Sequence, residues 1–173
     1  DGEQTNGSVL LRNGSSVSTN SGNVWIGGGS GTTTWKGLTV GDGYAVAGTW
    51  FTPSHGGGDA NAGVYLENTT VQTGGGNLLL KGDGSSNIWG IVTYGSNTLD
   101  SGSGTIEWEG INSSTTNHAG ILFGLHDVRK AGNTVFRSSA SNDAIKLMGI
   151  GKGSGDGVSI DGIVTMESTG AGS

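Results

Sequence analysis

The chain repeats one pattern, as GVYLENTTVQTGGGNLLL at residues 63–80 and GIVTYGSNTLDSGSGTIEW at residues 90–108. Each copy has three short apolar pieces separated by Gly, Asn, Ser and Thr, and Gly76 and Gly104 hold the same place in the two copies. Neither copy contains a segment long enough for a helix. A period of about 28 residues without a helix is typical of a β-solenoid, in which one period forms one turn of the coil.

Glycine is the unusual residue of this chain, with 37 copies among 173 residues against a single proline. Only 32% of the residues are hydrophobic and 13% are charged. A disordered chain would usually carry more charge and proline, and a collagen needs glycine at every third position. A solenoid fits this composition because its stacked turns share one thin apolar core.

Charge and cysteine content narrow the possible partners. The net charge of −6 argues against nucleic acid or an anionic membrane surface, and no apolar run approaches the roughly 18 residues that a membrane span needs. The chain has no cysteine, which excludes a disulfide framework and a thiolate metal site. We therefore expect no cofactor, no metal ion, no nucleic-acid partner and no insertion into a membrane.

The sequence predicts one all-β domain at residues 7–169, a parallel β-helix with about 27–28 residues per turn and five or six turns. Residues 1–6 are expected to be frayed or a linker, and residues 170–173 a tail. Asp1 is not a start residue, and both ends of the chain lie in Gly-, Ser- and Thr-rich sequence. We interpret the chain as a piece of a longer polypeptide.

One segment interrupts the pattern. The interval from Gly22 to Gly76 is twice the period, which leaves room for two turns, but residues 27–62 do not fit a regular one. Residues 38–40 and 44–46 alternate well enough to be strands. We expect a turn whose corner carries an enlarged loop here.

Side chains in a strand alternate between the inside and the outside of the coil. This alternation predicts an inward apolar row in each turn: Val64, Leu66, Val71, Leu78 and Leu80, then Ile91, Leu99, Ile106 and Trp108, then Ile121, Phe123, Val128 and Phe136. The period further predicts that Leu78, Ile106 and Thr134 occupy equivalent places in successive turns.

Five short segments share the character of a known repeat: GNVWIGGG (22–29), GYAVAG (43–48), GVYL (63–66), TGGGNL (73–78) and GSGTI (102–106). They resemble the shaft repeats of filamentous haemagglutinin-like exoproteins, the large bacterial adhesins secreted by the two-partner route. The resemblance covers roughly residues 7–136. It implies a right-handed parallel β-helix on the bacterial cell surface or outside the cell. The chain lacks the Asn-Pro-Asn motifs of the family's secretion domain, since its sole proline is Pro53, so the resemblance is to the shaft.

The first functional hypothesis is a non-enzymatic structural spacer in an adhesin or fibre. Stacked turns leave unpaired strand edges at the two ends of a coil. The expected partners are therefore the rest of a longer β-helical chain or further copies of the same chain, stacked end to end.

The second hypothesis is a glycan-binding module. Four aromatic residues lie in or near the enlarged segment, namely Trp35, Tyr44, Trp50 and Phe51. Exposed aromatic faces can stack on sugar rings or pack against a neighbouring chain. Alternatively, these side chains cover the wall of the coil and shield the backbone of the loop.

The third hypothesis is a polysaccharide-active enzyme of β-helix type. Glu107 and Glu109 both face outward on one strand and could act as a carboxylate pair, and His126–Lys130 is a dense charged cluster. His55 and His118 are isolated, and residues 153–158 hold a single imperfect copy of a calcium-binding repeat. We favour a solvated surface for the charged groups and predict that the chain is not an enzyme.

Overall fold

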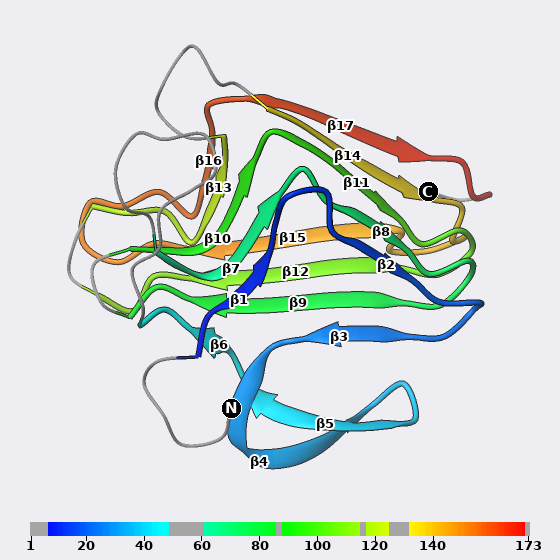
Figure 1. Ribbon diagram of the computed structural model, residues 1–173, viewed down its shortest axis with the longest axis horizontal. Coiled ribbons are helices and arrows are strands. Elements are labelled where there is room, and N and C mark those ends of the chain that lie inside the picture. Colours follow the sequence, from blue (N-terminus) through cyan, green and yellow to red (C-terminus); the bar gives the residue numbers. More distant parts are fainter. Residues whose placement is uncertain (1–6, 49–60, 86–87, 115–116, 125–131, 172–173) are drawn as a thin grey trace.

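The structure is a computed structural model that describes residues 7–48, 61–85, 88–114, 117–124 and 132–171. Within these residues the chain forms strands and turns and no helix. Strands far apart in the sequence lie side by side and parallel, so the chain winds as a stack of turns (Figure 1). The predicted parallel β-helix is confirmed. The expected linker at residues 1–6 and the last two residues of the tail lie outside the described residues.

Three sheets run along the stack, and their strands come from successive turns. The first contains β1 (Val9–Leu11), β7 (Ala62–Glu67), β10 (Trp89–Tyr94), β13 (Ile121–Phe123) and β16 (Val158–Ile160). The second contains β2 (Ser16–Ser18), β8 (Thr70–Gln72), β11 (Ser96–Asp100), β14 (Asn133–Ser138) and β17 (Ile163–Ser168). The third contains β3 (Val24–Ile26), β9 (Leu78–Asp83), β12 (Ile106–Ile111) and β15 (Ile145–Ile150). The described chain therefore has five levels in two sheets and four in the third.

The register of strand pairing gives the length of each turn. Val64 pairs with Ile91 and Leu78 pairs with Ile106, which corresponds to turns of about 27–28 residues. These pairings confirm the predicted period for the central turns. The next turn is longer: Ile91 pairs with Ile121, which corresponds to a turn of about 30 residues.

One predicted equivalence is wrong. Ile106 pairs with Leu78 on one side, as predicted, but with Ile145 rather than Thr134 on the other. Thr134 lies in the second sheet and pairs with Asn97. The regular period fails because the link from the first sheet to the second is much longer in this turn, from Phe123 to Asn133, than in the turn before, from Thr93 to Ser96.

The enlarged segment also differs from its prediction. β3 pairs with the first half of β9, and β6 (Ala45–Val46) pairs with the second half of the same strand. The residues between them form an antiparallel hairpin of β4 (Gly28–Trp35) and β5 (Leu38–Gly43). The insertion thus interrupts a strand instead of a corner, and the interval from Gly22 to Gly76 holds one turn. The hairpin extends past β3 at the N-terminal end of the stack (Figure 1).

An apolar core runs through the turns. Its fully buried side chains are Ala45, Val64, Leu66, Val71, Leu78, Leu80, Ile91, Leu99, Ile106, Trp108, Ile121, Phe123 and Phe136. This set contains every residue predicted to face inward except Val128, which lies outside the described residues. The Trp108 ring stacks on Phe123 at 5.7 Å and meets Phe136 edge-on at 4.9 Å, so aromatic contacts join all three sheets.

The corner between the second and third sheets repeats one hydrogen-bond pattern in successive turns. A hydroxyl donates to the carbonyl oxygen of a glycine that closes the corner, in the pairs Thr19–Gly22, Thr73–Gly76 and Ser101–Gly104. Side chains also link the turns: the N–H of Asn77 donates to Asn23 Oδ1 at 2.8 Å, and the N–H of Thr105 donates to Asn77 Oδ1 at 3.1 Å. The Gly, Asn and Thr of the repeated motif therefore build a polar ladder along the stack.

We predict that Gly104→Ala destabilises the fold much more than Gly22→Ala. A Cβ at Gly104 would lie 2.0 Å from the carbonyl oxygen of Gly76 in the preceding turn, and a stacked backbone cannot move aside cheaply. The expected loss in the free energy of unfolding is about 1–3 kcal/mol, measured by urea titration. Gly22 holds the same place in the first turn, where a Cβ would come nearest to the Thr19 side chain at 3.3 Å. Equal losses in the two variants would contradict the proposed stacking contact.

Candidate functional site

The predicted aromatic site is only partly described. Trp35 ends β4 at the tip of the hairpin, and Tyr44 follows β5 at its base. At a rise of about 3.3 Å per residue, the two positions are separated by about 20 Å along the strand. The structure therefore does not bring Trp35 and Tyr44 together. Trp50 and Phe51 lie outside the described residues.

Tyr44 belongs to a charged cluster on the outer face of the third sheet. Its hydroxyl donates to Glu109 Oε2 at 3.3 Å, and Lys81 Nζ lies 3.1 Å from the same oxygen and 4.7 Å from the centre of the Tyr44 ring. Burial, followed by the charge of Glu109, raises the pKa of Tyr44. Glu107 and Glu109 alternate with buried Ile106 and Trp108, as predicted for outward residues.

Other predicted features have definite places. His118 packs edge-on against Trp89, with ring centroids 4.9 Å apart, and residues 153–158 contain the turn that leads into β16. Across the described ranges, no group of three or more His, Asp or Glu side chains is arranged to hold a metal ion. In that part of the chain, no helix is long and apolar enough to cross a bilayer. His55 and the charged segment His126–Lys130 lie outside the described residues.

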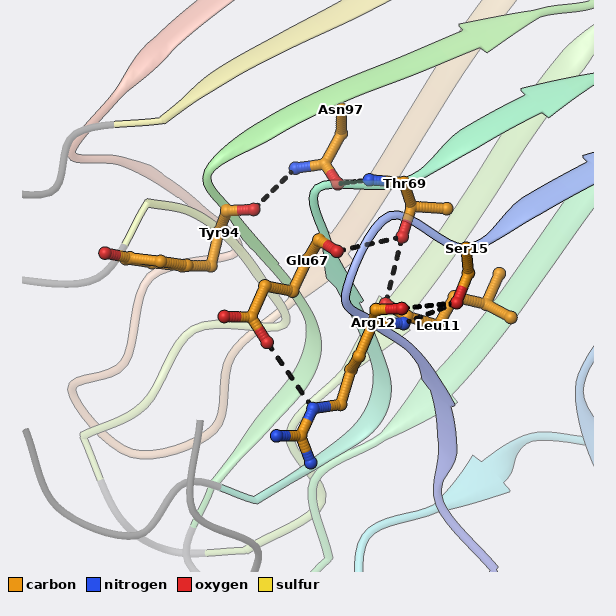
Figure 2. A network of polar contacts seen from close by, with 7 residues as sticks. All are labelled: Leu11, Arg12, Ser15, Glu67, Thr69, Tyr94 and Asn97. Atoms are coloured by element: carbon orange, nitrogen blue, oxygen red, sulfur yellow. Dashed lines mark hydrogen bonds and ion pairs between the residues drawn. The ribbon is translucent and has the colours of Figure 1, made fainter. Parts of the chain in front are cut away.

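A network of polar contacts joins three successive turns at the corner between the first and second sheets (Figure 2). The Thr69 hydroxyl donates to the carbonyl oxygens of Leu11 and Glu67, at 3.0 and 3.3 Å. The Thr69 N–H donates to Asn97 Oδ1 at 3.0 Å, and Asn97 Nδ2 donates to the carbonyl oxygen of Tyr94 at 3.0 Å. Thr69 and Asn97 therefore hold the backbone of neighbouring turns in register.

A buried carboxylate lies within this network. The Glu67 side chain is 0% exposed, and its Oε2 lies 3.4 Å from Nε of Arg12, which is 23% exposed. A buried charge is tolerated when it is paired and hydrogen-bonded. Tyr65, which precedes Glu67 on the same outer face, is also fully buried. Burial, and after it the charge of Glu67, strongly raise the pKa of Tyr65.

The C-terminal end of the stack exposes residues that face inward. Val158, Ile160 and Met166 are 39, 57 and 51% exposed. Their partners one turn earlier are Ile121, Phe123 and Phe136, each 1% exposed or less. We call the surface formed by the outer edges of β15, β16 and β17, together with these three side chains, the C-terminal end face. Within the described residues, no further turn covers it.

The N-terminal end is different, because the hairpin lies beyond β3 (Figure 1). The hairpin is held near its tip by Asn23, whose Nδ2 donates to the carbonyl oxygen of Lys36 at 3.0 Å. Its backbone also lies close to the outward Trp25 ring, since a Cβ on Gly41 would be 3.1 Å from Cη2 of Trp25. Thus Trp25 packs against the inserted hairpin.

Sequence reasoning predicted unpaired edges at the ends of the coil but missed two finer features. The side chains of the C-terminal end face follow from the apolar pairs Val158/Ile160 and Val164/Met166, each separated by one polar residue, once the longer turn is allowed for. The contact of Trp89 with His118 joins residues about one period apart in the sequence. The repeat could therefore have placed these two side chains one above the other.

The chain was compared with protein-family models, with curated proteins and with solved structures, and none of them matches it. The class of the protein therefore rests on its own strand pairing, which defines a parallel β-helix with an exposed apolar end.

We predict that Tyr65→Phe reduces the alkaline loss of stability. The pKa of Tyr65 is raised in the folded state, so between about pH 10 and the folded pKa the unfolded state binds fewer protons, and stability falls as pH rises. A phenylalanine has no proton to lose. Urea unfolding from about pH 7 to pH 11 should therefore show a shallower decline above pH 10 in the variant than in the unchanged protein. Parallel declines in the alkaline range would contradict the prediction.

Proposed function

We propose that this chain is a structural, non-enzymatic segment of a bacterial cell-surface or extracellular adhesin or fibre. The segment resembles the right-handed shaft of filamentous haemagglutinin-like proteins. Its main-chain hydrogen bonds run along the stack, and its apolar core and polar ladder repeat from turn to turn. Such an arrangement supports a stiff spacer.

The C-terminal end face carries this proposal. Val158, Ile160 and Met166 continue the buried rows of the core but remain about half exposed. Covering such side chains releases free energy, at about 25 cal/mol for each Å² of apolar surface removed from water. The unpaired edges of the strands beside them offer main-chain donors and acceptors in the spacing of a parallel sheet. The surface that fits best is another β-helical turn.

That turn belongs to the rest of a longer chain or to a second copy of this one. In a stack of copies, β16 and β17 of one copy would meet β1 and β2 of the next. A head-to-tail contact of this kind does not close on itself and generates filaments. The hairpin beyond β3 would have to fit beside the incoming turn, and it limits how closely the third sheets approach.

We predict that the double variant Ile160→Asp/Met166→Asp loses end-to-end association. Two buried carboxylates without partners would strongly disfavour the contact. Sedimentation velocity over a range of concentrations should show growing assemblies of the unchanged chain and a monomer for the variant. Electron microscopy should show the assemblies as stacks.

Val135→Asp is the matched control for this experiment, because Val135 faces outward from β14, which is covered by β17 and lies one level in from the C-terminal end. It should associate like the unchanged chain. An unchanged chain that stays monomeric at high concentration would contradict stacking between copies, and association that survives Ile160→Asp/Met166→Asp would place the contact elsewhere.

A further inference from the structure

A hollow of about 400 Å³ lies on the outer face of the first sheet. Residues in and beside β10, β13 and β16, from three successive turns, line it. Its described lining consists of Trp89, Asn117, His118, Ala119, Leu122, Asp156, Ser159 and Asp161. We call this hollow the outer groove. Ser159 of its lining lies on β16, beside the C-terminal end face, but none of the three apolar side chains of that face lines the groove, and neither do the hairpin aromatics. Its volume lies within the size range of small-ligand sites, about 300–1,000 Å³.

One wall of the outer groove is aromatic. The Trp89 and His118 rings meet at 65° with centroids 4.9 Å apart, so the imidazole supports the indole edge-on. Trp89 remains partly exposed, and Leu122, 4% exposed, forms an apolar floor. A flat apolar surface of this kind stacks on the C–H face of a sugar ring.

The other wall is polar and rich in acceptors. Asp156 and Asp161 are exposed carboxylates, and Ser159 adds a hydroxyl. Carboxylates accept strong hydrogen bonds from the hydroxyl groups of a ligand. An aromatic side chain and two carboxylates that line the same hollow therefore match a sugar ring, which has an apolar face and a rim of hydroxyl donors.

Hydrogen bonds hold the lining in place. Asn112 Nδ2 donates to the carbonyl oxygen of His118 at 2.7 Å. The N–H of Gly120 donates to the carbonyl oxygen of Asp156 at 3.1 Å, and the N–H of Asp161 donates to that of Phe123 at 2.8 Å. The side chains of the groove thus project from backbone that is already ordered, which lowers the cost of binding.

The charge of the groove selects among sugars. Its described lining contains two carboxylates and neither Lys nor Arg, and the whole chain carries a net charge of −6. An acidic sugar would be repelled and would leave its own carboxylate without a cationic partner. We propose that the outer groove binds an uncharged sugar unit of a glycan. This inference goes beyond the structural role proposed above and does not depend on it.

The test uses lactose, maltotriose, mannobiose and N,N′-diacetylchitobiose as neutral probes and 3′-sialyllactose as the acidic probe. Titrations followed by NMR should show at least one neutral probe shifting the indole N–H signal of Trp89. Trp89→Ala should weaken that probe's binding by about tenfold or more, and Asp156→Asn/Asp161→Asn should weaken it as well. The sialylated probe should bind more weakly than lactose.

Trp35→Ala is the control, since it removes an aromatic side chain at the hairpin tip, away from the outer groove. It should bind the probes like the unchanged chain, and thermal unfolding should show that each variant is folded. The proposal is overturned if none of the neutral probes binds, if binding survives Trp89→Ala, or if Trp35→Ala abolishes it. Tighter binding of 3′-sialyllactose than of lactose would overturn the assignment of an uncharged ligand.

Discussion

The direct stacking of each corner on the corner one turn earlier is the contact on which the structure depends. Asn23 and Asn77 each bond the next turn through a side-chain oxygen, and Gly104 leaves no room for a Cβ against the carbonyl oxygen of Gly76. A slip of one residue would break these bonds and turn the apolar rows outward. Polar corners and apolar core therefore specify the same register, and agreement between such local and global preferences favours one fold.

A stacked core has no natural end, and this links the fold to the proposed function. Each turn covers the one before it, so the last described turn leaves Ile160 and Met166 exposed. The hairpin gives the other end a different surface. The outer wall is also uneven: Arg12 pairs with the buried Glu67 at one corner, while Trp89 lies in an open groove. A structural coil can in this way carry a binding surface on its side without any change in its core.

The sequence was sufficient for the features that repeat and insufficient for those that interrupt the repeat. Leu78 and Ile106 were placed correctly because one uninterrupted period joins them, whereas Thr134 was misplaced because a longer link precedes β14. The glycines that follow Ile26 indicated a break, but β6 is too short to show that the broken strand resumes. The pairing of Arg12 with Glu67 spans that insertion, so no local pattern could predict it. The proposed ligand site at Trp35 and Tyr44 was inferred from closeness in sequence, and the hairpin separates them.

The most direct test of the stacked coil uses pairs of introduced cysteines, since the chain has none of its own. Asp100 pairs with Arg137 on one side and with Gln72 on the other. Neighbouring levels are about 4.8 Å apart, and two levels about 10 Å, beyond the reach of a disulfide. Under mild oxidation, Asp100→Cys/Arg137→Cys should form an intramolecular disulfide, and Gln72→Cys/Arg137→Cys should not. A chain in which the first pair stays reduced, or in which both pairs oxidise equally well, would contradict the parallel in-register coil.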